Sequence, residues 1–424
     1  MSGWETVGIG EVAQIINGDR GKNYPSAQHR TDWGIPFINA GHLSGGRVRL
    51  DAMDFIPLER FDLLRGGKVE TNDVLLCIRG SIGRWALVTP EVVPGAIASS
   101  LVILRPGSRV LPRFLASYLA SPEGARALLA SDNGAAQPNV GAQQVARLQL
   151  ALPPIQAQHR IVGVLDAIDD LIEGNRLRIS VLEAMARAIY REWFVRFRYP
   201  GHESVPLVDS AIGSIPEGWS ATQLADVVTT QYGYTESAST EPIGPKYLRG
   251  MDINKQSWVN WSTVPYCPID QVARSKFKVE VGDVFVIRMA DPGKVGICEE
   301  DVDAVFASYL VRLRPDITQL LPYFLFFTLL DDRYQAWVTG ASTGSTRKSV
   351  SAKVMTEPLI VLAPMSIQDS FVDAVRPLRE TMRTLTQSNA RLAAIRDQLL
   401  PRLVTGQIDV TSLNLDRVLE EAVA

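Results

Sequence analysis

Residues 161–189 read IVGVLDAIDDLIEGNRLRISVLEAMARAI, and the spacing of apolar residues here indicates the architecture of the chain. Spacings of four and three residues alternate, as at the a and d positions of a coiled coil: Ile161, Leu165, Ile168, Ile172, Asn175, Ile179, Leu182, Ala186 and Ile189. A second stripe keeps this phase except at Arg396: Phe371, Val375, Leu378, Met382, Leu385, Asn389, Leu392 and Leu399. Two such stripes favour paired long helices over ordinary amphipathic helices packed on a globular core.

Each stripe contains one asparagine, Asn175 in the first and Asn389 in the second. A polar residue at a core position lowers stability and commonly fixes register. If the helices pair antiparallel with these asparagines facing each other, helix 161–197 lies against helix 367–403 almost end to end. We therefore predict an antiparallel pair in this register.

Short motifs recur at an offset close to half of the 424 residues. The recurring pairs are Gly3-Trp4 with Gly218-Trp219, Asp73-Val74 with Asp283-Val284, Leu104-Arg105-Pro106 with Leu313-Arg314-Pro315, and Leu111-Pro112 with Leu321-Pro322. Two copies are too few for a solenoid, so each copy holds a whole domain and a connecting element. The chain is therefore expected to present two related surfaces to a binding partner that has two related, non-identical halves.

Each copy is predicted to be a domain of the α/β (α+β) class, and the two domains stand in tandem. Apolar runs bounded by Gly and Pro predict buried strands at 73–79, 100–104, 283–287 and 308–313. Helices are expected at 112–130 and 322–338, each with a proline in its first turn. The predicted segments are domain one at 1–154, helix one at 155–199, a linker and domain two at 200–365, helix two at 366–404, and a tail at 405–424.

Composition is that of an ordinary globular protein, with 46% hydrophobic and 21% charged residues. No apolar run is long enough to span a membrane, and the first residues lack the features of a signal peptide. The cysteines at 77, 267 and 298 are expected to be free buried thiols in a reducing cytoplasm. A net charge of −3 argues against a generally basic nucleic-acid coat but allows local basic patches.

Strong catalytic motifs are absent from the sequence. It contains no phosphate-binding loop of the G-x-x-x-x-G-K-[ST] form, no G-x-G-x-x-G after a strand, and no Asn/Asp-Pro-Pro-Tyr/Phe run. The four histidines are isolated from one another and show no metal-ligand spacing. Ser345-Thr-Arg-Lys348 matches S-x-x-K but has no companion motifs. These absences favour a binding or scaffold protein without a metal site.

Polar, basic and aromatic residues gather in equivalent loops of both copies, and these residue types hold phosphates and read base edges in DNA. In copy one the candidates are Arg20, Lys22, Asn23, Tyr24, Arg30, Arg79, Ser81, Arg84, Asn133, Gln137 and Asn139. In copy two they are Tyr232, Tyr234, Arg274, Lys276, Lys278, Arg288, Lys294, Thr343, Ser345, Thr346, Arg347 and Lys348. Each residue taken alone could be a solvated loop residue, but unlike residues in equivalent loops suggest two different half-sites.

These features together resemble the specificity subunits of type I restriction–modification systems, the HsdS family. The resemblance covers essentially the whole chain in family order. It rests on Leu152-Pro153-Pro154, Gln158-His-Arg-Ile161, Ala186-Arg-Ala-Ile-Tyr-Arg-Glu-Trp-Phe-Val-Arg-Phe197, Gly213-Ser-Ile-Pro-Glu-Gly-Trp219, Arg396-Asp-Gln-Leu-Leu-Pro-Arg-Leu403 and Gly406-Gln-Ile-Asp409.

The resemblance implies a non-catalytic, cytoplasmic subunit whose two target-recognition domains bind a bipartite, asymmetric site on double-stranded DNA. It also implies that the helices dock two modification (HsdM) subunits, which carry S-adenosylmethionine, and that two restriction (HsdR) subunits can join. No cofactor is expected in this chain. The apolar face of the first helix is wider than a two-stranded seam, and Val164, Leu171, Met185, Trp193, Phe194 and Phe197 could dock partners or pack on their own domain.

Helix length suggests how two half-sites would be separated. A helix over 161–197 would span roughly 55 Å at about 1.5 Å per residue, so we expect helix length to set the spacer between half-sites. The rival interpretations are a two-module scaffold that binds protein or small ligands through a coiled-coil spacer, and an enzyme with an unrecognised site.

Overall fold

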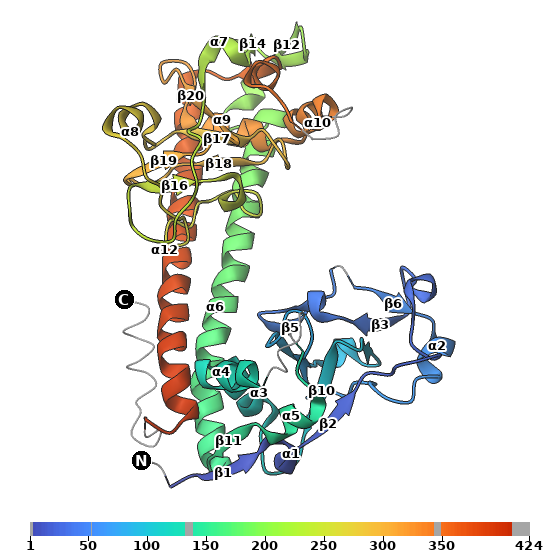
Figure 1. Ribbon diagram of the computed structural model, residues 1–424. Coiled ribbons are helices and arrows are strands. Elements are labelled where there is room, and N and C mark those ends of the chain that lie inside the picture. Colours follow the sequence, from blue (N-terminus) through green and yellow to red (C-terminus); the bar gives the residue numbers. More distant parts are fainter. Residues whose placement is uncertain (1–2, 52, 132–138, 343–348, 409–424) are drawn as a thin grey trace. The chain divides into compact units, whose positions relative to one another are not determined.

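The computed structural model describes residues 3–51, 53–131, 139–342 and 349–408 (Figure 1). The chain divides into two compact units, each of which is described by itself. Unit 1 comprises residues 1–172 and 391–424, and unit 2 comprises residues 173–390. Each unit thus contains one α/β domain and one end of each long helix, so the division falls within the segments 155–199 and 366–404.

Unit 1 is built on a six-stranded sheet with the order β2-β10-β7-β8-β5-β4. All neighbours are antiparallel except β5 and β8. Two smaller pairings are β1 with β11, antiparallel, and β3 with β6 and β9. The strands are β1 (Glu5–Gly8), β2 (Ala13–Asn17), β3 (Ile35–Ile38), β4 (Leu43–Ser44), β5 (Gly46–Val48), β6 (Phe55–Ile56), β7 (Val74–Cys77), β8 (Trp85–Leu87), β9 (Ala96–Ile97), β10 (Leu101–Pro106) and β11 (Gln149–Leu152).

Both faces of this sheet are buried. Successive side chains of β10 point to opposite faces, so they join two different cores. Val102 and Leu104 join the core that contains helix residues such as Phe114 and Ile168. Ile103 joins a second core on the other face. The helices are α1 (Ile9–Val12), α2 (Leu58–Asp62), α3 (Pro112–Ala120), α4 (Pro122–Ala130), α5 (Ala142–Arg147) and the first part of α6 (Ile155–Tyr190).

Unit 2 repeats the central part of this plan with the antiparallel order β15-β20-β17-β18. Its strands are β12 (Leu207–Ser210), β13 (Gly213–Pro216), β14 (Ser220–Gln223), β15 (Val228–Tyr232), β16 (Lys246–Leu248), β17 (Val284–Ile287), β18 (Val295–Ile297), β19 (Ala304–Phe306), β20 (Leu310–Pro315) and β21 (Leu359–Leu362). Its helices are α7 (Leu224–Val227), α8 (Gln271–Phe277), α9 (Pro322–Leu330), α10 (Asp332–Ala341), α11 (Ala352–Thr356) and parts of α6 and α12 (Met365–Val404). A π-helical turn, Arg191–Val195, follows α6.

The repeated sequence motifs form one repeated ion pair. In unit 1 the Arg105 guanidinium donates from Nε and Nη2 to the buried Asp73 carboxylate, at 2.9 Å each. In unit 2 Arg314 donates to the buried Asp283 in the same way, at 2.7 and 3.0 Å. Each carboxylate also accepts a backbone N–H three residues earlier. The Asp-Val and Leu-Arg-Pro repeats are therefore two ends of one cross-strand contact.

A second repeated device attaches each domain to the helix that follows it. The fully buried side chain of Gln158, in the first turn of α6, accepts from Leu111 N–H and donates to the carbonyls of Arg109 and Pro153. Gln368, in the first turn of α12, makes the same three contacts with Leu321, Gln319 and Ala363. Each glutamine satisfies three backbone groups that would otherwise be buried without partners.

Both units bring segments of α6 and α12 together. In unit 2 Asn175 of α6 donates to Asn389 of α12 at 3.0 Å, as predicted. Farther along α6, Ala186 shares a core with Phe371 of α12, so the two segments of this unit run antiparallel. In unit 1 Asp169 of α6 accepts from Arg396, the residue that interrupts the second stripe, at 3.0 Å.

The contacts between domain and helix differ in polarity between the repeats. In unit 1 Arg113 of α3 donates to Asp169 and Asp166 on α6. The position of Asp169 corresponds in the repeat to Arg379 on α12. There the buried Arg379 donates to Glu299 at 2.7 and 2.8 Å, and Tyr323, the counterpart of Arg113, donates to the same carboxylate at 2.9 Å.

The prediction of one helix at 112–130 was wrong, as was that at 322–338. α3 ends and α4 begins at Ser121, whose extended backbone suits a residue before Pro122 and whose hydroxyl caps α4. In unit 2 Asp331 takes the same place and accepts from Arg333 N–H. A capping side chain therefore separates two helices in each unit, at a position where the apolar pattern alone predicted one continuous helix.

Candidate nucleic-acid interface

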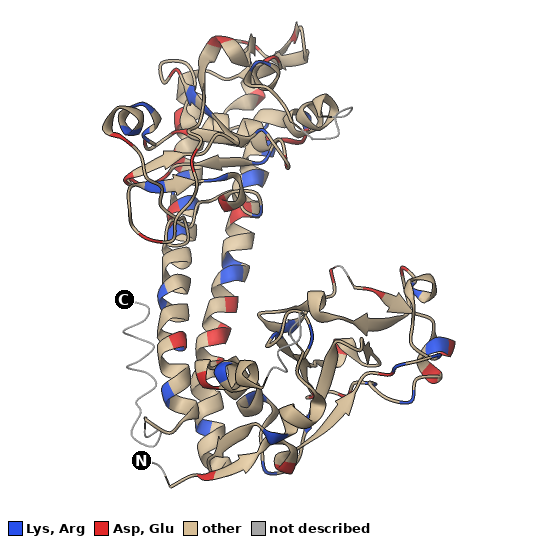
Figure 2. Cartoon of the chain, in the orientation of Figure 1, with Lys and Arg blue, Asp and Glu red and all other residues tan. Residues whose placement is uncertain are grey.

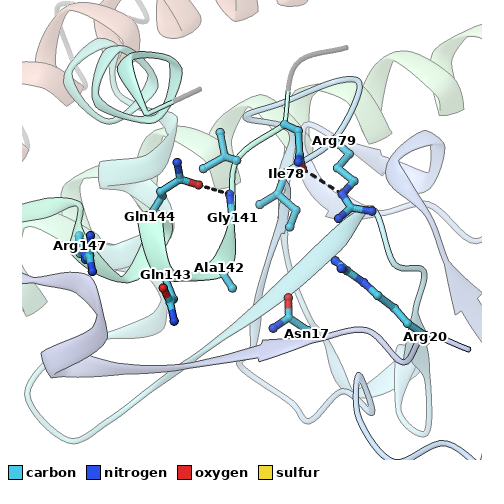
Figure 3. A pocket seen from close by; sticks show the side chains of 11 residues that line it. Asn17, Arg20, Ile78, Arg79, Gly141, Ala142, Gln143, Gln144 and Arg147 are labelled. Atoms are coloured by element: carbon cyan, nitrogen blue, oxygen red, sulfur yellow. Dashed lines mark hydrogen bonds between the residues drawn. The ribbon is translucent and has the colours of Figure 1, made fainter. Parts of the chain in front are cut away.

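A pocket of about 570 Å³ lies at one edge of the main sheet of unit 1 (Figure 3). Its lining comes from the end of β2, the residues after β7, and α5 with the residues before it: Asn17, Arg20, Ile78, Arg79, Asn139, Val140, Gly141, Ala142, Gln143, Gln144 and Arg147. The fold thus brings together three of the predicted residues, Arg20, Arg79 and Asn139. The charged residues among these lining residues are all arginines.

The floor of this pocket is fixed by the backbone. Val140 N–H donates to the carbonyl of Ile78 at 2.9 Å, which holds the segment before α5 against the end of β7. Next to this contact, Arg79 Nε donates to Asn139 Oδ1 at 3.0 Å. Figure 3 shows the guanidinium groups of Arg79 and Arg20 pointing toward the same space. Two converging cations beside amide groups suit a ligand rich in hydrogen-bond acceptors, such as a phosphate or a guanine edge.

Several other candidates in unit 1 already have protein partners. Arg30 forms an ion pair with Asp54 at 3.0 Å, and Asn23 donates to the Leu63 carbonyl. The Tyr24 ring packs edge-on against Phe37. Lys22, Ser81 and Arg84 are exposed, and Arg84 donates to the Ala40 carbonyl at 3.4 Å. Asn133 and Gln137 lie outside the described residues.

Unit 2 has different chemistry at the equivalent place. The Arg288 guanidinium lies over the Tyr232 ring, 4.8 Å from its centre, and the Tyr232 hydroxyl accepts from Ala352 N–H at 3.0 Å. The bridge between Arg79 and Asn139 corresponds here to a bridge between Met289 and Ser349. A cation stacked on an aromatic ring therefore stands where unit 1 has an open arginine fork.

The remaining candidates in unit 2 are spread over other loops. Arg274 pairs with Asp303 at 2.6 Å, and Lys276 lies over the Phe277 ring. Tyr234 packs against the same ring. Lys278 and Lys294 are exposed. Thr343, Ser345, Thr346, Arg347 and Lys348 lie outside the described residues.

Sequence reasoning missed the four other polar side chains that line the pocket, those of Asn17, Gln143, Gln144 and Arg147. Asn17 ends β2, and the other three lie on α5, directly after the loop that holds Asn139. Because polar residues at strand ends and first helical turns are common, only the fold identifies these as neighbours. Figure 2 shows blue arginine and lysine positions around this sheet edge, although the whole chain carries a net charge of −3.

The helix residues considered for partner docking lie mostly in their own domains. Val164 and Phe194 are buried, and Leu171, Trp193 and Phe197 pack against core residues of their own unit. Met185 is different, because 47% of it is exposed. Leu177 and Val181, which precede it at four-residue spacing on α6, are about 60% exposed (61% and 58%). Leu177 and Val181 lie off the a/d stripe, so the heptad pattern gave no reason to predict them as a docking surface.

Known proteins with similar sequences and folds indicate the class. Residues 1–184 match a family model described as "Type I restriction modification DNA specificity domain". The chain is 22% identical to the MjaIX specificity subunit of Methanocaldococcus jannaschii, over 97% of this chain and 94% of that protein. It is 23% identical to the EcoBI specificity subunit of Escherichia coli, over 96% of this chain and 86% of that protein.

The fold is also found among solved structures. A crystal structure of the type I restriction–modification S subunit from M. genitalium matches with a TM-score of 0.55 and 14% identity, over 95% of this chain and 96% of that one. The chain is thus similar along nearly its whole length to type I restriction enzyme specificity subunits, and its first 184 residues match the model of their DNA specificity domain. Among the described residues, no helix is long and apolar enough to cross a membrane, and no group of residues could hold a metal ion.

Proposed function

We propose that this protein is the DNA-specificity subunit of a type I restriction–modification complex and is itself non-catalytic. Its two recognition domains bind the two unlike halves of a bipartite DNA site. The observation that carries this proposal is the arginine-lined pocket of unit 1, whose repeat-equivalent place in unit 2 has different residues. Arginines both hold phosphates and read bases, so unlike residues at equivalent places would select unlike sequences.

The long helices would separate the two half-sites. α6 contains 36 residues and α12 contains 40. At about 1.5 Å per residue the shorter helix measures roughly 54 Å, which is on the order of 16 base pairs of DNA. We therefore infer an antiparallel coiled coil whose length sets the spacer. Adding one helical turn to both helices, near their midpoints, should lengthen the preferred spacer, and an unchanged spacer would contradict this role.

The exposed apolar stripe Leu177–Val181–Met185 is the surface that we assign to the modification subunits. These partners would supply S-adenosylmethionine and the methyl transfer, and restriction subunits would join the same complex. A single helix face with three large exposed apolar side chains suits a partner helix. The variant V181E should prevent co-purification with the modification subunit, whereas S180E, an exposed neighbour, should not. Normal assembly of V181E would exclude this stripe.

The central experiment is sequence selection from randomised duplex DNA by the full chain assembled with its modification subunits. A bipartite consensus with a fixed spacer is expected. The double variant R20A/R147A should lower affinity, with a flatter dependence on salt, because fewer phosphate contacts release fewer counterions. The matched control is R126A, an exposed arginine on α4. Selection of no consensus by the wild-type complex would favour the scaffold interpretation.

A further inference from the structure

One side chain in the unit 1 pocket is held in the orientation that base reading requires. Arg79 is the second residue after β7, and its backbone lies opposite Asn139 in an isolated bridge. Its Nε is already used by Asn139 Oδ1 at 3.0 Å. Among the described residues no acceptor is found for its two terminal nitrogens. The bond at Nε therefore fixes the plane of the guanidinium and leaves its outer edge toward the pocket.

That outer edge carries two parallel N–H donors. In the major groove, guanine alone presents two neighbouring acceptors, O6 and N7, which a guanidinium fork matches in a bidentate contact. A phosphate would also accept from Arg79, but lysine too binds phosphate, as a point charge, so a phosphate contact does not require a guanidinium plane fixed in one orientation. The restraint by Asn139 thus favours base reading over backbone contact.

The corresponding place in unit 2 lacks this device. Met289 replaces Arg79, and Ser349 replaces Asn139, in the equivalent bridge. The neighbouring Arg288 cannot substitute for it, because its guanidinium lies over the Tyr232 ring and its Nε is buried without a partner among the described residues. The two repeats therefore differ in one specific donor pair.

We propose that Arg79, positioned by Asn139, reads a guanine in one half of the DNA site and that unit 2 makes no equivalent contact. This assignment rests on the proposed function and adds the base, the residue and the half-site. Asn139 is a positioning residue, since it acts through Arg79.

The test is sequence selection from randomised duplexes by the full chain with its modification subunits, for the wild type, R79A, R79K and N139A. For R79A we expect preference for guanine at one position of one half-site to fall about 5- to 150-fold. R79K should lose the same preference while keeping most of the affinity for DNA. N139A should weaken the preference at that position only.

Matched controls make the result specific. R126A, an exposed arginine on α4 of the same unit, should leave the consensus unchanged, and M289A should leave the first half-site unchanged. Equal loss of affinity for all sequences in R79A, with rescue by R79K, would overturn the assignment in favour of a phosphate contact. An unchanged consensus in R79A would also overturn it while leaving the proposed function intact. If the wild type selects no consensus, both the proposed function and this assignment fail.

Discussion

Asn175 and Asn389 form a side-chain hydrogen bond of 3.0 Å between α6 and α12 within unit 2. Only 7% of Asn175 is exposed, so the bond satisfies polar groups that water barely reaches. Such a pair is less stable than two apolar residues but penalises other registers, because a slipped helix would leave one amide facing aliphatic side chains.

We expect N175L alone to lower the free energy of unfolding by about 1–3 kcal/mol, since it leaves Asn389 without its partner. The double variant N175L/N389L should regain that loss or exceed wild-type stability. Urea denaturation of both single variants and the double variant gives the coupling free energy. Additive losses in the double variant would mean that the two amides do not act as a pair.

The buried ion pair of Arg379 with Glu299 should be sensitive to loss of one partner. R379M would leave the carboxylate of Glu299, whose side chain is 12% exposed, without its cation. We expect a loss of about 3–5 kcal/mol, measured by chemical denaturation. R376M, on the exposed face of the same helix, is the control and should change stability little. A similar effect of both variants would assign the loss to helix propensity.

Loss of the buried Gln158 or Gln368 side chain should destabilise only the domain to which that glutamine attaches its helix. Q158A would leave Leu111 N–H and two carbonyls without partners, and should lower stability by about 1–3 kcal/mol. Amide hydrogen exchange should then quicken around the start of α3, while α9 remains protected. Q368A should give the opposite pattern, and the exposed Q156A should give neither. Loss of protection in both domains from Q158A alone would contradict this local role.

Two buried thiols give a pH-dependent contribution. Burial raises the pKa of Cys267 to about 11 and that of Cys298 to about 12. In the unfolded chain these thiols ionise near their ordinary value, so the unfolded state binds fewer protons than the folded state above about pH 9. Stability should therefore fall as pH rises from about 9 toward 11.

The reactivity of the same thiols checks this directly. Folded protein should react slowly with iodoacetamide at pH 9, and protein unfolded in urea should react fast, as followed by mass spectrometry. The variant C298A should show a shallower fall of stability with pH than the wild type. Fast alkylation of folded protein at Cys267 and Cys298 would show that the thiols are accessible.

Helix pairing was predictable because it depends on the periodic spacing of apolar residues and on asparagine, which is rare at core positions of such a stripe. The positions of Asn175 and Asn389 within the two stripes were therefore sufficient to predict the register. The repeat was predictable for a similar reason, since Asp73 and Arg105 recur as a pair. The free, buried cysteines were also anticipated correctly.

Surface chemistry was harder to predict, because a side chain's neighbours depend on the path of the chain. Arg30 and Arg79 were equally plausible in the sequence, yet Arg30 pairs with Asp54 whereas Arg79 lines a pocket. The break at Ser121 was missed because apolar content continues through it, and only the capping hydroxyl and Pro122 indicate a new helix.

The charges at the contact between domain and helix are reversed between the two units: the domain supplies the cation in unit 1 and the anion in unit 2. This reversal limits how genes for specificity subunits can recombine. A hybrid that joined the first domain to α12 would bring Arg113 against Arg379, and the reciprocal hybrid would bring Glu299 against Asp169. Either product would place like charges in a poorly solvated contact. Viable exchanges of DNA specificity should therefore have breakpoints that carry each recognition domain together with the first turns of its own helix.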